Sequence, residues 1–408
     1  MTVDIARVGA QLEALAAFSD APAPAVTRVL WTAQDMAMRA WLKQEALEAG
    51  FSWREDALGN TFIRLEGSDP SLPAITTGSH CDAIPHSGRF DGTVGVLGGL
   101  EALRVLREKN LRRSVELVMF TAEEPTRFGL GCLGSRAMSG AISADELRAL
   151  NDADGVDLET ARRAVGYTDP LETVRLKDGY YAGFVELHIE QGPLLERDQK
   201  QIGVVSAVAA PASFFLHLHG EGGHAGARLM PGRRDALLAA SEIALAVERA
   251  ALEGDVGNTV GTVGLLEVHP GAINSIPSRV KMGVDIRDTD AQRRDLAVNS
   301  ALEATREICT RRNVEFTFEA INSDPPAACD PTLLEAIRNA ARNADASTLE
   351  MVSRAYHDTL FMARVCPVAM IFIPCRGGVS HRPDEYAKPE DIAKGIEVLA
   401  RTLETLAA

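Results

Sequence analysis

One stretch, from residue 78 to residue 92, constrains this chain more than any other part of it. It reads Gly-Ser-His-Cys-Asp and, after five further residues, Gly-Arg-Phe-Asp-Gly, so that His80, Asp82 and Asp91 fall within twelve residues. An apolar run ending at Thr77 predicts a β-strand before it, and an amphipathic pattern over residues 93–110 predicts a helix after it. Imidazole and carboxylate groups at the end of a strand are the donors that a divalent metal ion requires. The stretch therefore predicts a metal site.

Later segments repeat this arrangement, in which a chemically active side chain follows a strand-like run. Glu123 and Glu124 follow the run 114–120. His188 lies near the end of the run 184–189, and His381 follows the run 368–373. Strands that alternate with helices, and carry active residues at their ends, predict an α/β sheet with helices on both faces.

The middle of the chain has a different pattern. Strand and helix signals over residues 207–321 follow the order βαββαβ, which is typical of one small ferredoxin-like domain. The α/β pattern then returns, with a helix over 331–343 and another over 389–406. We therefore expect residues 207–321 to form a domain inserted into a larger one, which is made of residues 1–206 and 322–408. The expected elements of the insertion are strands at 213–219, 258–267, 280–287 and 314–318, and helices at 232–253 and 289–311.

Composition and charge narrow the functional class. A chain of 408 residues can form two domains, each with its own core. A net charge of −15 with no offsetting basic patch argues against a nucleic-acid partner. No apolar run reaches the length of a membrane span, and the N-terminus lacks the pattern of a signal peptide. The six cysteines show no paired spacing and predict reduced thiols. We expect a cytoplasmic protein.

Five of these side chains can form a site for two metal ions. Asp91 would bridge the ions, His80 and His188 would hold one, and Glu124 and His381 would hold the other. Mixed imidazole and carboxylate donors suit zinc or manganese, and the residue types do not distinguish the two. Each histidine alone could equally be a hydrogen-bonded loop residue, but five such groups at strand ends favour the site.

The acidic residues beside the ligands have expected roles of their own. Asp82, two residues from His80, could accept the second N–H of that imidazole and fix its tautomer. Glu123 and Glu124 are neighbours, and in an extended chain their side chains point in opposite directions. One of them can therefore bind metal while the other acts as general base towards the attacking water. The alternative is a solvated acidic loop.

The insertion carries three polar residues of interest. His224, in Gly-Gly-His-Ala-Gly, could donate a hydrogen bond to a developing oxyanion, although a surface histidine in a turn is the alternative. Asn274 and Arg287 are suited to a substrate carboxylate, although a strand-end arginine often forms a surface ion pair.

Taken together, these motifs resemble the dinuclear metal amidohydrolases that include N-carbamoyl-L-amino acid hydrolases, allantoate amidohydrolases and ureidoglycolate amidohydrolases. The resemblance covers nearly the whole chain and implies an aminopeptidase-like catalytic domain with an inserted domain that forms a lid and a homodimer. It implies the ligand set above, Glu123 as the catalytic acid/base, and substrate contacts from Gln191, His224, Asn274 and Arg287. It further implies that the insertion lends the last three residues to the neighbouring subunit's site. The motifs are Gly78–Asp82, Gly88–Gly92, Phe120–Glu124, Glu186–Pro193, Gly223–Gly226 and Ser380–Pro383.

Two segments resemble the ureidoglycolate branch of that family. One is Pro-Thr-Arg-Phe directly after the glutamate pair, and the other is Ser353–Asp358, which contains Tyr356 and His357. Tyr356 would fill the space beside the substrate's α-carbon and offer one hydroxyl to a polar substituent. His86, in the metal loop, departs from the family pattern.

These observations predict a metal-dependent enzyme that hydrolyses the ureido amide C–N bond of a small ureido acid. The resemblance favours (S)-ureidoglycolate, with glyoxylate, ammonia and carbon dioxide as products, in the breakdown of purines through allantoin. An N-carbamoyl-L-amino acid hydrolase or an allantoate amidohydrolase is the alternative within the family. A metallo-aminopeptidase is disfavoured because Asn274 and Arg287 suit a free carboxylate. A binding protein without metal on the same fold is a remote alternative.

Overall fold

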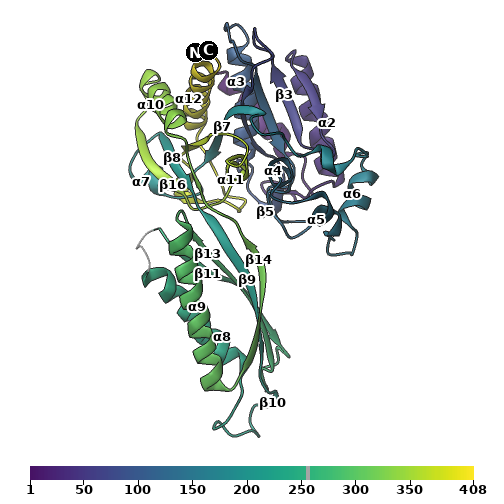
Figure 1. The fold of residues 1–408 in the computed structure, drawn as a ribbon, viewed down its shortest axis with the longest axis vertical. Helices are drawn as coiled ribbons and strands as arrows, with labels where there is room; N and C mark the ends of the chain where they lie inside the picture. The colour runs from purple at the N-terminus through teal and green to yellow at the C-terminus, as the bar shows by residue number, and fades with distance from the viewer. Residues whose placement is uncertain (254–257) are drawn as a thin grey trace. The chain divides into compact units, whose positions relative to one another are not determined.

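The computed structural model describes residues 1–253 and 258–408, which divide into two compact units (Figure 1). The first unit comprises Met1–Ala207, Ala328–Ser353 and His357–Ala408. The second unit comprises Val208–Ala327 together with Arg354–Tyr356. Of the insertion expected at residues 207–321, residues 208–321 belong to the second unit, which continues to Ala327 and has a longer last strand than the sequence pattern indicated.

A nine-stranded mixed sheet forms the centre of the first unit. Four neighbouring strands in the order β17-β7-β4-β6 are parallel and almost wholly buried, as strands covered on both faces must be. Their carboxyl ends therefore meet at one edge of the sheet. The bounds are β4 Ala74–His80, β6 Val115–Phe120, β7 Tyr181–Ile189 and β17 Val368–Ile373, flanked by β2 Ser52–Glu55, β3 Thr61–Leu65, β8 Ile202–Val208, β15 Ala327–Ala328 and β16 Thr348–Ser353.

Helices cover both faces of this sheet, as the sequence predicted. Successive residues of β6 alternate between two apolar clusters: Leu117 and Met119 join one, and Val118 and Phe120 join the other. The first cluster includes residues of α1 Ile5–Ala16, α2 Ala33–Glu48, α3 Thr93–Leu106, α10 Pro331–Asn343 and α12 Pro389–Ala407. The second includes residues of α4 Leu133–Ser139, α5 Ala144–Ala149, α6 Leu158–Ala164, η1 Leu171–Thr173 and α11 Asp358–Met362. The remaining elements are β1 Val26–Arg28, β5 Ala83–Ser87, α7 Leu194–Arg197 and η2 Arg376–Gly378.

Local sequence signals explain where several helices begin. Thr32 accepts a hydrogen bond from the amide of Asp35 at the start of α2. At α10, Asp330 accepts hydrogen bonds from the amides of residues 332 and 333, and Pro331 is the first helical residue, where its missing N–H costs nothing. The helix that the sequence predicted over 331–343 thus begins at Pro331.

The second unit is a four-stranded antiparallel sheet with two helices on one face. The strand order β11-β13-β9-β14 and the element order βαββαβ are those of a ferredoxin-like domain, as predicted. Alternate residues of β13 are buried against the helices, while the other face of the sheet is open. The bounds are β9 Ala210–His219, α8 Ala236–Glu253, β11 Val260–His269, β13 Arg279–Asp288, α9 Ala291–Arg312 and β14 Glu315–Ser323, with a short ribbon of β10 Gly223–His224 and β12 Ser275–Ile276.

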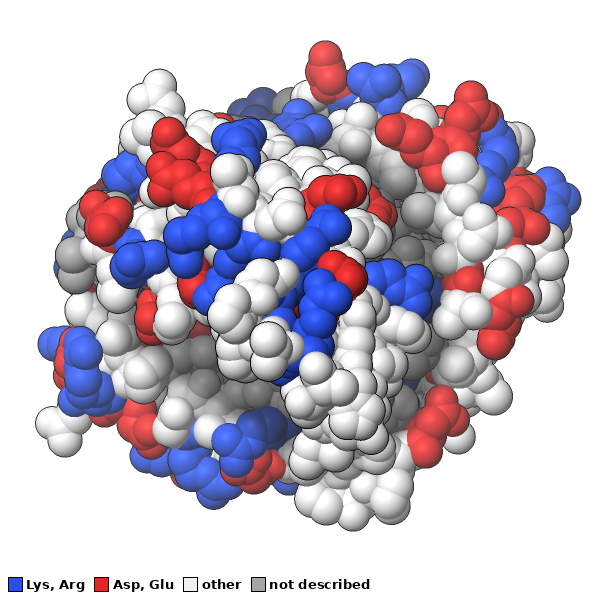
Figure 2. Space-filling model, turned by 90° about the horizontal axis from the view of Figure 1, so that it is seen from below, with Lys and Arg blue, Asp and Glu red and all other residues white. Residues whose placement is uncertain are grey.

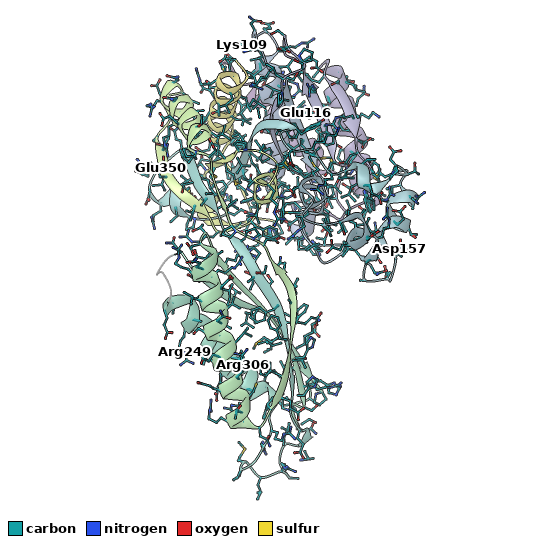
Figure 3. The ribbon with its side chains drawn as sticks, viewed as in Figure 1. Lys109, Glu116, Asp157, Arg249, Arg306 and Glu350 are labelled. Carbon is teal, nitrogen blue, oxygen red and sulfur yellow. The ribbon has the colours of Figure 1, made fainter. Side chains whose placement is uncertain are left out.

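Most charged side chains lie on the surface, but some carboxylates are buried. Arg249 and Arg306 extend from the solvent-facing sides of α8 and α9, whereas Glu116 is buried in the first unit, where the Tyr181 hydroxyl donates to it (Figure 3). On the face drawn in Figure 2, lysine and arginine side chains gather near the middle, with acidic side chains among them. Within the second unit, Arg228 pairs with Glu221.

In the described ranges, no helix has the length and apolar character needed to cross a bilayer.

Candidate metal centre

The expected metal ligands of the first unit come from the carboxyl ends of its parallel strands. His80 is the last residue of β4, and His188 is the penultimate residue of β7. Glu123 and Glu124 follow β6 after two intervening residues, and Asp91 lies in the loop before α3. Because parallel strands end at the same edge of the sheet, these side chains converge there.

The convergence produces two groups of donors that share one carboxylate. Asp91 Oδ1 lies 3.1 Å from His188 Nε2 and 3.6 Å from His80 Nε2. Its other oxygen, Oδ2, lies 3.1 Å from His381 Nε2, and this nitrogen is 3.1 Å from Glu124 Oε1. Within each group the donor atoms lie within 4.8 Å of one another. The structure thus brings all five expected ligands together, with Asp91 between the two groups.

The hydrogen bonds of the imidazoles fit a cation at these positions. His80 Nδ1 lies 3.1 Å from the carbonyl oxygen of Asp82, and His188 Nδ1 lies 2.8 Å from that of Ile189. A carbonyl can only accept, so each Nδ1 carries a hydrogen, and each Nε2 is the nitrogen left to bind a cation beside Asp91.

The pKa values of Asp91 and His381 reflect how strongly these two side chains interact. Burial opposes the charge on Asp91, but its contacts with His188, His381 and His80 hold its pKa well below the usual range. Hydrogen bonds to Asp91 and Glu124 raise the pKa of His381 to about 11. The His381 imidazolium therefore supplies positive charge that a metal ion would replace.

The two adjacent glutamates occupy different environments. Glu124 belongs to a donor group, whereas Glu123 belongs to neither group among the described residues. Glu123 Oε2 lies 3.7 Å from His80 Nε2, and the Cys132 thiol donates to its other oxygen over 3.7 Å. Burial, together with the neighbouring carboxylates, raises the pKa of Glu123 well above its usual value. A carboxylate with a raised pKa accepts a proton more readily and can return it, and its place beside the donors therefore suits acid/base chemistry.

Asp82 lies in the centre but makes different contacts from those expected. The hydrogen bond of His80 goes to the backbone carbonyl of Asp82, and the carboxylate lies 3.6 Å from the same nitrogen. That carboxylate accepts the amide N–H groups of Glu123 and Glu124, at 3.2 and 3.0 Å. Ala122, just before them, has a left-handed conformation with φ of 53°. The chain therefore turns sharply here, instead of continuing as the extended segment that the sequence suggested, and Asp82 holds the turn.

Gln191 and His357 also lie at the centre. Gln191 Nε2 donates to Asp91 Oδ2 over 2.8 Å, while its Oε1 is buried and has no hydrogen-bond partner among the described residues. The His357 ring packs against that of His188 with the centroids 4.5 Å apart, and its Nε2 lies 3.0 Å from Ser353 Oγ. His86, whose role the sequence left open, is exposed on β5 and donates its amide hydrogen to Thr27.

Sequence reasoning missed two buried carboxylates near the ligands. Asp358 accepts a hydrogen bond from Ser135, and burial beside Glu186 raises its pKa to about 8. Glu385 accepts hydrogen bonds from the backbone of the Asp91 loop. Glu385 follows His381 by four residues, and this proximity to a ligand was the available signal.

The second unit separates the remaining expected site residues into two groups. His224 and Asn274 are neighbours, because β10 pairs with β12 and the amide of Ala225 donates to the carbonyl of Asn274 over 2.9 Å. This ribbon adjoins the first residue of β13, Arg279, whereas Arg287 lies eight residues further along the strand. A strand rises about 3.3 Å per residue, which places Arg287 about 26 Å from that end.

This separation bears on the expectation that all three residues serve one neighbouring site. A small acid cannot contact both Arg287 and the His224–Asn274 ribbon of the same chain. Arg287 instead forms a bidentate pair with Asp285, and its guanidinium lies 5.7 Å from the centre of the Tyr356 ring.

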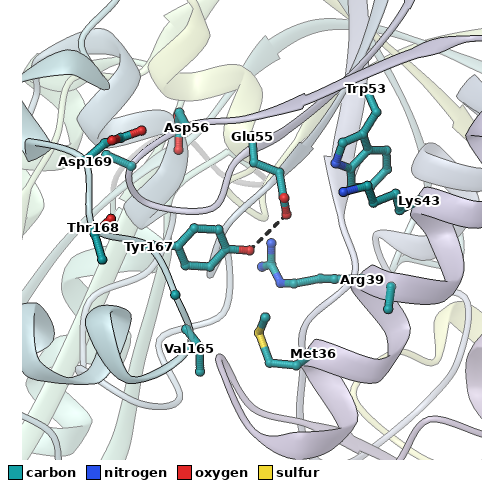
Figure 4. A pocket seen from close by; sticks show the side chains of 13 residues that line it. Met36, Arg39, Lys43, Trp53, Glu55, Asp56, Val165, Tyr167, Thr168 and Asp169 are labelled. Atoms are coloured by element: carbon teal, nitrogen blue, oxygen red, sulfur yellow. Dashed lines mark hydrogen bonds between the residues drawn. The ribbon is translucent and has the colours of Figure 1, made fainter.

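A separate pocket of about 410 Å³ lies in the first unit between α2, β2 and residues 165–169 (Figure 4). Tyr167 donates a hydrogen bond to Glu55 across it, and Arg39 and Met36 form its floor. None of the expected site residues lines it.

A carboxylate shared between two histidine-containing donor groups, at the edge of a mixed sheet covered by helices, is typical of metal-dependent hydrolases. The model of peptidase family M20/M25/M40 matches residues 76–405, and the chain belongs to this family. This confirms the resemblance in the sequence.

Similar proteins span the whole chain. A ureidoglycolate hydrolase of Arabidopsis thaliana is 49% identical, covering 100% of this chain and 87% of that protein. The ureidoglycolate hydrolase of Oryza sativa subsp. japonica is 51% identical, covering 97% and 83%. An N-carbamoyl-L-amino acid amidohydrolase of Geobacillus stearothermophilus is 37% identical, covering 95% and 94%. A crystal structure of AtUAH in complex with glyoxylate superposes with a TM-score of 0.92 at 49% identity, covering 100% of this chain and 98% of that one.

Proposed function

We propose that this enzyme hydrolyses the ureido C–N bond of (S)-ureidoglycolate, with glyoxylate, ammonia and carbon dioxide as the final products, in the breakdown of purines through allantoin. The level of similarity carries this proposal. Two relatives named ureidoglycolate hydrolase are 49% and 51% identical, whereas an N-carbamoyl-L-amino acid amidohydrolase and an allantoate amidohydrolase are 37% and 32% identical. Structures of AtUAH with (S)-hydroxyglycine and with glyoxylate show ligands of the corresponding chemistry in a similar protein.

The donor groups support two divalent cations, manganese or zinc. Asp91 would contact both, His80 and His188 would complete one subsite, and Glu124 and His381 would complete the other. When bound, such ions polarise a carbonyl group and lower the pKa of water.

Glu123 carries out the proton transfers, and Asp82 and Gln191 assist it by positioning groups. Glu123 takes a proton from the attacking water as the C–O bond forms at the ureido carbon, and delivers it to the leaving nitrogen as the C–N bond breaks. Asp82 holds the turn that carries Glu123 through the two amides described above. Gln191 Oε1, which has no hydrogen-bond partner among the described residues, would accept a hydrogen bond from a substrate N–H.

The hydrogen bonds of His224 suit it to stabilise the oxyanion. The amides of Gly226 and Ala227 donate to its Nδ1 over 3.1 and 3.3 Å, so in the neutral ring the hydrogen resides on Nε2. An Nε2–H that faces solvent can donate to the oxygen of a tetrahedral intermediate. Asn274, its neighbour, and Arg287 suit the substrate carboxylate.

We further propose a homodimer in which each substrate site uses both subunits. Because Arg287 and His224 of one chain lie too far apart to share a substrate, one of them must serve the partner. Arg287 lies beside Tyr356, which immediately precedes His357 in the chain, so we assign Arg287 to its own chain's site. His224 and Asn274 are assigned to the partner's site.

The second unit offers an apolar surface for this dimer. Leu238, Leu245 and Leu252 lie seven residues apart on α8 and are 42%, 60% and 62% exposed. Residues at this spacing form one stripe along a helix. The adjacent edge strand β11 has one side free within the sheet order, where a second copy could add its own strand.

The cysteines support a location in the cytoplasm. All six are buried and unpaired in the structure. Burial raises the pKa of Cys81 and of Cys366 to about 12, so these thiols remain protonated and unreactive. Such thiols are typical of a reducing compartment.

A substrate panel tests the proposed activity. The protein, loaded with Mn²⁺ or Zn²⁺, should release ammonia from ureidoglycolate with a kcat/KM well above that for allantoate or N-carbamoyl amino acids. Rapid cleavage of bulky N-carbamoyl amino acids without cleavage of ureidoglycolate would support the carbamoylase alternative. A protein that binds no metal and cleaves none of them would support the binding-protein alternative.

A further inference from the structure

Glu385 connects two loops that carry metal ligands. It is a buried carboxylate, 4% exposed, that lies between the Asp91 loop and the His381 loop. Its Oε1 accepts the amide N–H of Phe90 over 2.7 Å and that of Asp91 over 3.1 Å. Its Oε2 accepts from the hydroxyl of Ser380 over 2.8 Å. One side chain therefore satisfies backbone donors on one loop and a side-chain donor on the other.

The contacts of Ser380 extend this connection to the shared ligand. Ser380 Oγ lies 2.9 Å from Asp91 Oδ2. The same Ser380 oxygen accepts a hydrogen bond from Gln191 Nε2 over 3.2 Å. The hydroxyl has a single hydrogen, so it can donate to Asp91 or to Glu385 but not to both at once. Glu385, Ser380 and Asp91 thus form one chain of contacts that ends on the carboxylate oxygen belonging to the His381 group.

The His381 loop needs such support because its own conformation is unfavourable. His381 has φ of 59°, a left-handed conformation that is unfavourable for a non-glycine residue. Its side chain is 46% exposed, whereas those of His80 and His188 are 2% and 1% exposed and belong to central strands. The subsite on the strands is therefore held by the sheet, and the subsite with His381 is held by loop contacts.

The packing around Glu385 leaves little freedom for rearrangement. A Cβ atom added to Gly88 would lie 2.4 Å from the Glu385 side chain, so a larger residue does not fit there. The rings of Phe90 and Tyr386 meet edge to face with centroids 5.8 Å apart, which joins the same two loops through an apolar contact. A hydrogen bond from the amide of Glu385 to the carbonyl of Arg382 closes the turn that brings Glu385 back beside Ser380.

We propose that Glu385 is a positioning residue of the metal centre, which holds the His381 loop against the Asp91 loop so that Asp91, Glu124 and His381 can bind their cation. This role rests on the two-ion site proposed above and deepens it. Glu385 belongs to neither donor group among the described residues and acts through Ser380 and the backbone of the Asp91 loop.

Zinc binding to the metal-free protein tests this role without any assay of activity. Wild-type protein titrated with Zn²⁺ against a chromophoric chelator should bind two ions per chain. Glu385→Gln should bind one ion as tightly as wild type and the other roughly 10- to 100-fold more weakly, which is the usual effect of removing a residue that supports a ligand. Asp384→Asn is the matched control, because it removes an exposed carboxylate from the same loop and should leave both affinities unchanged.

The possible results separate this role from the two-ion site itself. Two tight ions in Glu385→Gln, or an equal loss at both subsites, would overturn the positioning role and leave the two-ion site intact. A single ion in wild type would overturn both. If Glu385→Gln does not fold, as judged by its circular dichroism, Ser380→Ala takes its place. It removes one hydroxyl of the same connection and should weaken the same single subsite, and unchanged affinities in that variant would overturn the role.

Discussion

Asp91 organises the metal centre at the scale of single residues, because each of its two oxygens belongs to a different donor group. Three histidines contact it and hold its pKa well below the usual range, despite burial. The carboxylate therefore stays ionised across the physiological pH range and can attract a cation to either side. Of the two glutamates beside it, Glu124 belongs to a donor group and Glu123 does not, and replacing each in turn tests this difference.

Replacing Glu123 should lower the rate, whereas replacing Glu124 should lower the metal content. Glu123→Ala should keep its metal content and lose about 10²–10⁴ in kcat, the usual contribution of a general acid/base. Glu124→Ala, the matched variant, should lose metal because it removes a donor from the His381 group. Metal analysis after dialysis, together with ureidoglycolate turnover, measures both effects. Loss of metal from Glu123→Ala would reverse the assignment.

Tyr356 should decide which ureido acid is accepted. Its ring lies near the Arg287 guanidinium, which is suited to the substrate carboxylate. Tyr356→Phe retains the ring but lacks the hydroxyl. It should lower kcat/KM for ureidoglycolate about fivefold, the equivalent of one hydrogen bond of about 1 kcal/mol.

Tyr356→Gly is the companion variant, since it removes the ring as well. It should lower kcat/KM for ureidoglycolate and raise it for N-carbamoyl amino acids with larger side chains. If both activities fell together, Tyr356 would only pack its loop.

At the scale of elements, the turn between β2 and β3 supports the turn that carries Glu123. Asp56 accepts hydrogen bonds from the amides of Leu58 and Asn60 and from the Asn60 side chain. Asn60 in turn accepts the amide of Thr121, the residue that follows β6 and lies two positions before Glu123. The pocket beside α2 is lined in part by Asp56, so this turn forms one of its walls. Two short turns far apart in sequence thus hold each other in place.

Protonation of Asp56 should make stability depend on pH. Burial raises its pKa to about 6 in the folded protein, whereas an unfolded aspartate titrates near about 3.9. The folded state therefore holds an extra proton between these values, and its contribution to stability is complete below about pH 4 and is lost as the pH rises through about 6.

Thermal unfolding of wild type and Asp56→Asn from pH 4 to pH 7 measures this contribution, because the variant cannot titrate at this position. The free energy of unfolding of wild type, minus that of the variant, should fall between about pH 4 and about pH 6, by at most about 1.4 kcal/mol per unit, and stay level above about pH 6. A difference that does not change with pH would contradict the prediction.

At the scale of the whole molecule, the chain consists of two units with different tasks in the proposed enzyme. The first unit contains the complete set of expected metal ligands. The second unit contains His224 and Asn274 at one end of its sheet and Arg287 at the other. This distribution makes sense for a site that is completed by a second subunit.

Mixing inactive variants should show which residues cross between subunits. In mixed dimers of Glu123→Ala and His224→Ala chains, one of the two sites has both residues intact. Random exchange makes about half of the dimers mixed, so about one quarter of wild-type activity should return. Glu123→Ala mixed with Glu124→Ala is the control and should stay inactive, since both residues belong to the same chain's site.

Glu123→Ala mixed with Arg287→Ala should also stay inactive if Arg287 serves its own chain. Recovery in that mixture would move Arg287 to the partner's site. Mixed dimers of the His224 pair that form but remain inactive would show that each site is built from one chain. Leu245→Glu, which places a charge in the exposed stripe of α8, should weaken the dimer in sedimentation measurements.

The sequence by itself determined the elements and the chemical class. The local residue pattern predicted α10 over 331–343 and β17 over 368–373 with the bounds that the structure has, because such a pattern is contained within each element. The five expected ligands could be recognised because strand ends in an α/β sheet converge and because their residue types suit metal. Their places at strand ends were visible without any knowledge of contacts.

Only the tertiary structure decided how the side chains are used. The Asp82 carboxylate holds the amides of residues 123 and 124, and Glu385 reaches back almost 300 residues to the Asp91 loop. The opposite positions of His224 and Arg287 depend on the course of β13 through its sheet. Hydrogen bonds between distant loops, and distances across a sheet, depend on how elements pack together, and no local pattern in the sequence records that packing.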